Sequence, residues 1–389
     1  MAIQKLISFT NRLEDPKHPL MGPSIKALYF FGLWRSGNTR RYLLNFYHST
    51  SFIFVFSEFL DLYRVRYDIN LVINNLSLTV LSLVCASKCF FYLVSKKQWS
   101  ELVMKISRTE LEQLNSKDSK TKEIIKEYTK YTRIITFLYW VVVFLTIILL
   151  FISPFLKYLS TSYREAVRTG KEPLPQILCS WFPFDNTKMP GYAVGVIVHI
   201  IMGCQGSGLL AAYDMNAVAV MTYFKGQMII LKEKCRRIFD GTINDKVVLD
   251  KIRECHKLHN ELIDQYEMFD SLLSPPMFLY VLLCSMTICS SIVQYNSVNA
   301  TISQKVWLLQ YSASLVIQLF LYCWHGNEVL IQVRSDPMEW LDKKYRMLLQ
   351  RVNFIFKTKL RGFIRPLSFP MNHRYTKRIP INAKHHIIR

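Results

Sequence analysis

Few side chains of this 389-residue chain combine the types and the spacing that chemistry requires. His256 and His259 lie three positions apart, which places two imidazoles on one face of a helix, as some zinc sites require. The residues after them lack a metalloprotease pattern, so the polar face of a solvated helix is the competing interpretation. Because no nucleophile and base occur together in the apolar segments either, we predict no enzyme, no cofactor and no metal.

Among the titratable side chains inside the apolar stretches, where such groups usually face the protein interior, we single out His199, Lys88 and Asp214. His199 has the chemistry to hydrogen-bond a carbonyl or hydroxyl ligand, or to satisfy a neighbouring backbone carbonyl instead. Lys88 and Asp214 both fall towards the same side of the membrane in their stretches. Snorkelling or a mutual ion pair would relieve their cost of desolvation, and we assign both a structural role.

The nine cysteines do not form a disulfide framework. Only Cys179 falls in a segment expected outside the cell, and a disulfide needs two thiols in an oxidising compartment. We therefore predict no disulfide. The other cysteines lie in apolar stretches or in a basic block assigned to the cytosol: Cys85, Cys89, Cys204, Cys235, Cys255, Cys284, Cys289 and Cys323.

Six apolar stretches must position these groups, and each is long enough to cross a hydrocarbon core of about 30 Å. They span 43–60, 71–94, 134–156, 192–223, 275–298 and 306–331. The hydrophobic fraction of 51% is typical of a membrane protein that crosses the bilayer several times. We predict an all-α fold, a polytopic bundle of membrane helices in contact with lipid.

The segments that connect these stretches are alternately rich and poor in Lys and Arg. This pattern predicts the orientation of the stretches in the membrane. The segments expected inside carry 7, 10, 9 and 14 of them, and those expected outside carry 2, 5 and 1. Cytosolic flanks carry the excess of positive charge, so the N-terminus is cytosolic, opposite to G-protein-coupled receptors. Membrane orientation also explains the net charge of +21, and we predict no nucleic-acid partner.

Two long helices are expected to project inward. Residues 192–240 contain no proline, and 49 residues of helix would measure about 74 Å, far more than a bilayer. The block 246–274 has helical periodicity as well. We therefore predict that residues 221–274 form a cytosolic packing region. In the short loop assigned outside, Asn299-Ala300-Thr301 makes Asn299 a candidate glycosylation site.

The segment 318–329, which reads QLFLYCWHGNEV, resembles the signature between helices six and seven of insect odorant receptors. That signature is a Tyr/Cys/aromatic run followed by Gly-Asn-Glu. The segment 214–231, beginning Asp-Met-Asn-Ala-Val, is similar to the family's fourth helix. Either His256 or His259 fits the histidine before its fifth helix, and 340–346 is similar to its last cytosolic stretch. The resemblance covers most of residues 20–351.

The resemblance implies a seven-helix subunit of a ligand-gated cation channel that detects volatile organic molecules in a sensory neuron's plasma membrane. It implies a heterotetramer with a shared co-receptor, joined by a cytosolic anchor. We expect a cytosolic segment 1–42, a helix bundle 43–331 whose inward part 221–274 belongs to the anchor, and an anchor helix 332–351. The residues expected in subunit packing are Tyr322, Gly326, Asn327, Trp340 and Tyr345.

The family's ligand pocket lies among the outer halves of the helices, so the predicted topology selects candidate ligand residues. Phe144, Ile148 and Phe151 share one helical face by their spacing, although such a stripe is equally typical of packing or lipid contact. The full candidate set is Leu76, Val80, Phe144, Ile148, Phe151, Val196, His199, Gly203, Gln294 and Gln310.

The segment 352–389 departs from the family at the position of its seventh helix. Five Lys or Arg lie between 351 and 365, and each central cation costs about 2.5–3.5 kcal/mol on insertion. The alternatives to an odour-binding channel subunit are therefore a non-conducting variant that only associates with the co-receptor, and a gustatory receptor of the same topology. The Gly-Asn-Glu signature argues against the gustatory receptor, and the absence of an internal repeat argues against a secondary transporter.

Overall fold

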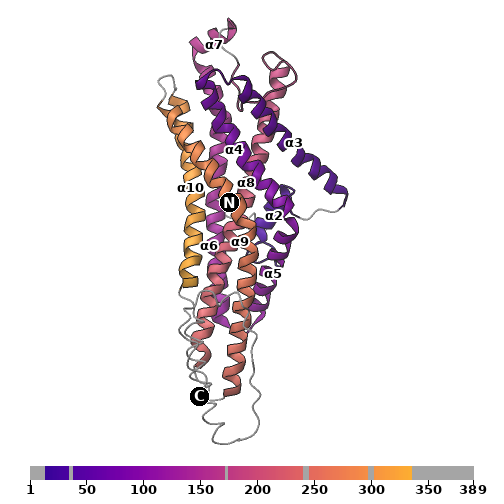
Figure 1. The fold of residues 1–389 in the computed structure, drawn as a ribbon, viewed down its shortest axis with the longest axis vertical. Coiled ribbons are helices and arrows are strands. Elements are labelled where there is room, and N and C mark those ends of the chain that lie inside the picture. Colours follow the sequence, from indigo (N-terminus) through magenta and orange to yellow (C-terminus); the bar gives the residue numbers. More distant parts are fainter. Residues whose placement is uncertain (1–13, 35–37, 171–173, 240–244, 297–301, 335–389) are drawn as a thin grey trace, which may run out of the picture. The chain divides into compact units, whose positions relative to one another are not determined.

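The computed structural model describes residues 14–34, 38–170, 174–239, 245–296 and 302–334, and its regular elements there are all helices (Figure 1). The prediction of an all-α fold is confirmed. The described helices belong to one compact unit, Met1–Pro337. They are α2 (Gly22–Phe30), α3 (Asn38–Arg64), α4 (Ile69–Val94), α5 (Lys96–Asn115), α6 (Ser119–Leu156), α7 (Thr161–Arg168), α8 (Gly191–Arg236), α9 (Asp245–Tyr295) and α10 (Ile302–Arg334).

Five of the described helices are long and apolar enough to cross a membrane: Leu71–Val94, Ser119–Leu156, Gly191–Arg236, Val247–Tyr295 and Gln304–Val333. They contain four of the six predicted stretches in full and residues 275–295 of a fifth, 275–298. The remaining stretch, 43–60, forms part of α3 but is not among the five, since His48, Glu58 and Asp61 interrupt the apolar sequence of this helix. The predicted tail 352–389 lies outside the described residues.

The three longest helices extend well beyond the length that a bilayer requires. Helix α6 has 38 residues, α8 has 46 and α9 has 51, and 51 residues correspond to about 76 Å. The predicted continuous helix after Tyr192 is confirmed. Helix α9 also continues through Pro275 and Pro276, as membrane helices can when neighbouring helices and side chains compensate for the lost backbone hydrogen bonds.

Helix α8 lies at the centre of the bundle, in contact with α4, α6, α9 and α10. Every residue from 211 to 224 is buried, as expected for a helix that is surrounded on all sides. Two glycines permit this close packing. A Cβ atom on Gly208 would overlap the ring of Phe31, and one on Gly226 would overlap the ring of Tyr128. Small residues therefore let α2 and α6 approach the backbone of α8.

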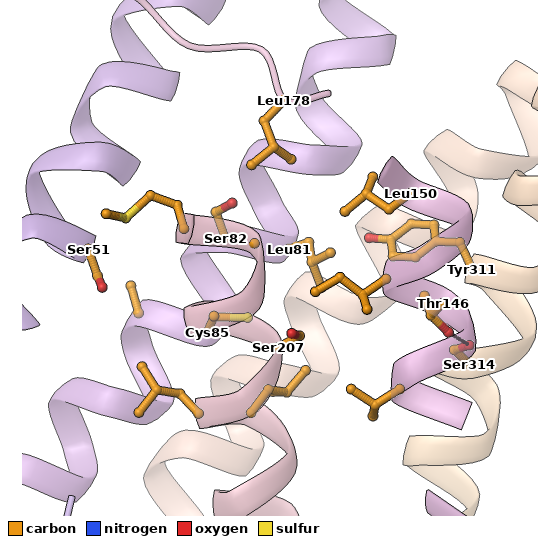
Figure 2. A pocket seen from close by; sticks show the side chains of 18 of the residues that line it. Ser51, Leu81, Ser82, Cys85, Thr146, Leu150, Leu178, Ser207, Tyr311 and Ser314 are labelled. Atoms are coloured by element: carbon orange, nitrogen blue, oxygen red, sulfur yellow. Dashed lines mark hydrogen bonds between the residues drawn. The ribbon is translucent and has the colours of Figure 1, made fainter. Parts of the chain in front are cut away.

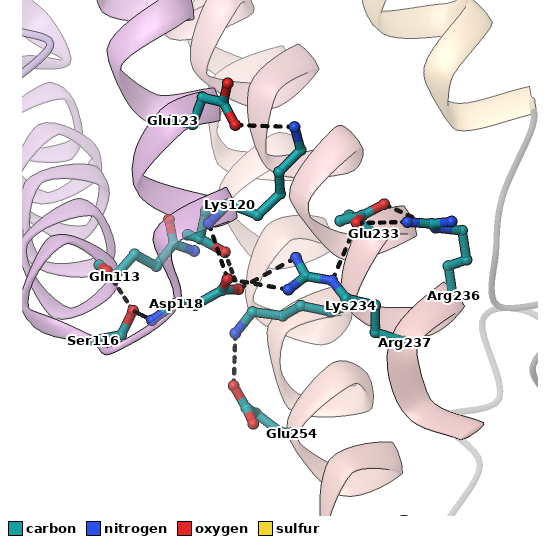
Figure 3. A network of polar contacts seen from close by, with 11 residues as sticks. Gln113, Ser116, Asp118, Lys120, Glu123, Glu233, Lys234, Arg236, Arg237 and Glu254 are labelled. Atoms are coloured by element: carbon teal, nitrogen blue, oxygen red, sulfur yellow. Dashed lines mark hydrogen bonds and ion pairs between the residues drawn. The ribbon is translucent and has the colours of Figure 1, made fainter. Parts of the chain in front are cut away.

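Charged side chains connect the C-terminal end of α8 to the turn between α5 and α6 and to the N-terminal part of α9 (Figure 3). Arg237 bonds Asp118, in the turn between α5 and α6, at 3.1 Å and Glu233 at the same distance. Lys234 of α8 bonds Glu254 of α9 at 2.6 Å. Partly exposed ion pairs contribute little stability, so their main effect is to fix how the turn and the two helices meet.

Candidate functional site

A cavity of about 130 Å³ lies between α3, α4, α6, α8 and α10 (Figure 2). The charge pattern predicts that this side of the bundle faces outward. An apolar cavity of about 150 Å³ holds a benzene molecule, so this volume suits a ligand with a single ring or a short chain. Most of the lining is apolar: Phe54, Val55, Leu81, Ala86, Val142, Val143, Ile147, Leu150, Leu178, Met202, Leu209, Leu210 and Leu315.

The cavity exists because α8 carries small residues on the face that turns towards it. Gly203, Gly206 and Ser207 follow the spacing i, i+3, i+4 and all line the cavity. A Cβ atom on Gly206 would meet only Cys85, at 3.8 Å, whereas one on Gly203 would meet the Phe151 ring at 2.9 Å. Missing side-chain volume at Gly206 thus leaves open space, whereas the Phe151 ring fills the space beside Gly203.

The floor of the cavity is formed in part by Tyr139 and Gln318, which also bind a buried carboxylate beneath it. Asp214 receives Lys88 Nζ at 2.6 Å and the Tyr322 hydroxyl at 2.7 Å on Oδ1. Its Oδ2 receives the Tyr139 hydroxyl at 2.7 Å and Gln318 Nε2. These five side chains, which we call the Asp214 cluster, come from α4, α6, α8 and α10. Of the two alternatives for Lys88 and Asp214, snorkelling and a mutual ion pair, the structure shows the ion pair.

Helix α9 joins the Asp214 cluster through an aromatic ring. Lys88 Nζ lies 4.3 Å from the centroid of the Tyr280 ring and 5.3 Å from that of Tyr322. Both charges of the ion pair are almost completely buried. A buried carboxylate that accepts four donors and a buried ammonium that faces aromatic rings are both compensated. One ion pair therefore connects five helices immediately below the cavity.

The structure brings part of the predicted ligand set to the cavity. Gly203 lines it, the Phe151 ring approaches Gly203, and Gln310 donates to Thr146 and Ser314, which are lining residues. Leu76 and Val80 pack instead in the neighbouring core around Tyr280 and Tyr311. Gln294 donates to the Ile73 carbonyl oxygen at 2.9 Å and to Ser77 Oγ at 2.6 Å.

Other members of the predicted set lie on neighbouring faces. His199 Nε2 bonds Ser180 Oγ at 2.7 Å, and its ring packs near Phe54 and Phe182. Val196 packs in the cluster around Phe54, close to Leu178. Phe144 is exposed, and Ile148 is half-buried without reaching the lining. Val196 and His199 thus pack near Phe54, which lines the cavity, but they do not line the cavity themselves.

The predicted anchor and glycosylation residues have different surroundings. Tyr322 is buried in the Asp214 cluster, whereas Gly326 and Asn327 are exposed on α10, and a Cβ atom on Gly326 would meet nothing within 4 Å. Trp340 and Tyr345 lie outside the described residues, as does Asn299.

Sequence reasoning missed the lining residues of α6 and α10, although periodicity marks them. Residues 143, 146, 147 and 150 of α6 line the cavity, as do 311, 314, 315 and 318 of α10, both at the spacing i, i+3, i+4, i+7. The predicted stripe of Phe144, Ile148 and Phe151 is the adjacent face of α6. A polar residue within such an apolar stripe, such as Thr146 or Gln318, was the signal for the inward face.

An all-helical bundle that crosses the membrane several times and encloses an apolar cavity is the architecture of a multi-pass membrane receptor. The chain matches the family model described as 7tm Odorant receptor over residues 68–335. It therefore belongs to the odorant receptor family of insects, a family of odorant-gated ion channels that are not enzymes.

Individual members of the family agree with this assignment. The chain is 20% identical over 321 residues to odorant receptor Or2 of Anopheles gambiae, covering 81% of this chain and 80% of that one. The solved structure of the olfactory receptor OR5 from Machilis hrabei superposes with a TM-score of 0.66 over 79% of each chain, at 14% identity. The same receptor in complex with eugenol gives the same values. The likeness to the solved structures concerns the fold.

Proposed function

We propose that the chain is an odour-binding subunit of a ligand-gated cation channel, and that a volatile organic molecule binds in the cavity above the Asp214 cluster. The observation that carries this proposal is an apolar cavity of about 130 Å³ inside a membrane bundle. Ligand pockets are mostly apolar and contain a few polar groups that orient the ligand. The eugenol complex of the Machilis hrabei receptor supports a ligand of this class.

Binding must favour one conformation of the channel for the ligand to open it. The Asp214 cluster provides a physical connection, because Tyr139 and Gln318 belong both to the cavity floor and to the cluster. A ligand that moves either side chain changes the contacts of Asp214, and with them the packing of several helices. Within the predicted ligand set we assign Gly203 to the wall, with Phe151 and Gln310 as its supports.

We further propose that the chain assembles with the shared co-receptor in the plasma membrane, with its N-terminus in the cytosol. The inner halves of α8 and α9, which extend past the membrane, and the inner end of α10 would form the anchor between subunits. Gly326 and Asn327 are exposed there and available for such contacts. Tyr322 would act from within the subunit, by holding α10 against Asp214.

The proposal is tested by recording currents from cells that express this chain with the co-receptor and from cells that express the co-receptor alone, across a panel of volatile compounds. We expect compounds that evoke current only when this chain is present. Silence across the panel, with the chain detected at the cell surface and bound to the co-receptor, would contradict the proposed function and favour a non-conducting variant.

A further inference from the structure

The hydrogen-bond donors around the cavity are almost all bonded to other groups of the protein, and this limits the ligands that the cavity accepts. We propose, on the basis of the function proposed above, that the cavity selects small apolar alcohols and phenols. It would bind isomers of equal size whose oxygen only accepts hydrogen bonds, such as ethers, more weakly. The ligand hydroxyl would donate to oxygen atoms of the cavity lining.

The floor of the cavity offers hydrogen-bond acceptors to a ligand, because Tyr139 and Gln318 already donate hydrogen bonds to Asp214. The Tyr139 hydroxyl has one hydrogen, which it donates to Asp214 Oδ2 at 2.7 Å, and Gln318 donates one N–H to the same oxygen. The lone pairs of the Tyr139 oxygen and of the Gln318 carbonyl group remain for a ligand. Asp214 accepts four donors, which fills the sites of a carboxylate, so a ligand reaches it only by displacing one of them.

In the wall between α6 and α10, the hydroxyl groups also donate their hydrogens to other groups of the protein. Thr146 and Ser314 face each other across the cavity wall with their oxygens 2.7 Å apart (Figure 2). The Thr146 hydroxyl donates to the Val142 carbonyl oxygen at 2.8 Å, and the Ser314 hydroxyl donates to that of Gln310 at 2.9 Å. If either hydroxyl instead donates to the other, its hydrogen still stays within the wall.

The hydroxyl groups on the other helices behave in the same way. Tyr311 donates to the Ser77 carbonyl oxygen at 3.3 Å, and Ser82 donates to Glu58 Oε1 at 3.0 Å. On α8, the Ser207 hydroxyl donates to the carbonyl oxygen three residues earlier, at 3.3 Å. Each of these oxygens retains lone pairs, and none of them offers a hydrogen to a ligand.

Among the described lining residues, two donors make no hydrogen bond to another group of the protein. They are the hydroxyl hydrogen of Ser51 and the second N–H of Gln318. Thiols in the lining donate only weakly. An ether or ketone oxygen buried against the remaining wall would lose its hydrogen bonds to water and gain none, which is unfavourable. A hydroxyl group, in contrast, meets several oxygens that can accept its hydrogen.

The test compares isomers that differ only in the position of oxygen, on cells expressing the full chain with the co-receptor. Benzyl alcohol is compared with methoxybenzene, and 1-pentanol with butyl methyl ether. The ethers are the less polar isomers, so an indifferent apolar cavity would favour them. We expect half-maximal activation by the alcohols at concentrations lower by about threefold or more, the effect of one net hydrogen bond.

Variants then locate the acceptor. Thr146→Val and Ser314→Ala each remove one oxygen from the lining without changing a member of the Asp214 cluster, and we expect at least one of them to reduce the alcohol preference while the response to methoxybenzene remains. That remaining response shows that the variant folds and reaches the surface. Leu150→Val, which changes an apolar lining residue, is the control and should leave the ratio between isomers unchanged.

The outcomes separate this proposal from the function on which it rests. Ethers that activate as well as or better than alcohols would overturn the selectivity and leave the receptor function intact. An alcohol preference that survives both variants would overturn the assignment to these oxygens. Silence for every isomer, together with silence across the wider volatile panel, would overturn both proposals.

Discussion

Asp214 is the side chain on which the buried polar contacts of this bundle converge. A buried charge is costly unless it is paired and hydrogen-bonded, and Asp214 is both. Its partner Lys88 lies 2.6 Å away and is equally buried. Replacing a whole buried pair by apolar residues can be neutral, whereas removing one partner leaves an uncompensated charge.

We therefore predict that Lys88→Met destabilises the chain strongly, by about 3 kcal/mol, because Asp214 loses its counter-charge. The melting temperature of the solubilised protein and its amount at the cell surface should both fall. The double variant Lys88→Met with Asp214→Leu should recover part of the loss, since no buried charge remains. A double variant that is less stable than Lys88→Met would contradict this account of the pair.

Glu110 of α5 is a second buried carboxyl group, in a helix outside the membrane spans. It accepts the Tyr128 hydroxyl at 2.6 Å and the Leu20 backbone N–H at 3.3 Å. Burial raises its pKa to about 7 from the ordinary value of 4.5, although both hydrogen bonds act in the opposite direction. The fold thus favours the protonated form. Its contribution to stability is complete below pH 4.5 and is lost as the pH rises through about 7.

The unfolding temperature of the wild-type chain should therefore decrease between pH 5 and pH 7.5, and Glu110→Gln should reduce that decrease. The glutamine remains neutral throughout, so its curve lacks the contribution of this group. Thermal unfolding measured at half-unit intervals of pH provides the comparison. Two curves that remain parallel over this range would show that Glu110 does not titrate as the structure implies.

At the scale of elements, the glycines of α8 have opposite surroundings although they share one helix. Gly226 lies against the Tyr128 ring of α6, with no room for a Cβ atom, while Gly206 opens onto the cavity. Alanine favours a helix over glycine by about 1 kcal/mol, and overpacking costs about 1–3 kcal/mol. The same substitution should therefore act in opposite directions at the two positions.

We predict that Gly226→Ala lowers the melting temperature, because α6 must move away from α8, and that Gly206→Ala maintains or raises it. Thermal unfolding of both variants beside the wild type tests this pair. Equal destabilisation by both would mean that helix contacts, and not free space, surround Gly206.

The helices themselves were largely predictable, because hydropathy and length identify a membrane span without any knowledge of its neighbours. Four predicted stretches and most of a fifth lie in helices that qualify as spans, and the long α8 was expected from the absence of proline after Tyr192. The stretch 43–60 shows the limit of this reasoning. Its polar residues lower the hydropathy of α3, yet His48 and Glu58 are buried in the bundle.

The site was less predictable, because periodicity identifies a stripe on a helix but not the neighbour that the stripe faces. Helix α6 carries no charge between residues 134 and 156 and has large apolar residues on every side, so Phe144 and Val143 were indistinguishable by type. The cavity depends on volume missing from α8 at Gly206, which is left unfilled only because of how the neighbouring helices pack. The pairing of Lys88 with Asp214 was foreseeable, since two opposite charges in apolar segments need partners.

In the molecule as a whole, the residues shared by the cavity and the Asp214 cluster connect ligand binding to the packing of the bundle. The cavity and the Asp214 cluster share Tyr139 and Gln318, and the cluster joins α4, α6, α8 and α10 while Tyr280 adds α9. Packed cores change between discrete arrangements rather than deforming continuously. A ligand that alters this floor would therefore shift helices that continue far beyond the membrane.

If the cavity binds the odorant that opens the channel, a side chain that fills the cavity should reduce the response to that odorant. Ligand-evoked current should be measured for Gly206→Leu, which extends a side chain into the space, and for Ile201→Phe, which adds volume on an exposed face of α8. At equal surface amounts with the co-receptor, we predict that Gly206→Leu loses at least about tenfold in sensitivity while Ile201→Phe responds as the wild type does. A Gly206→Leu channel that keeps the wild-type sensitivity would show that the odorant binds elsewhere.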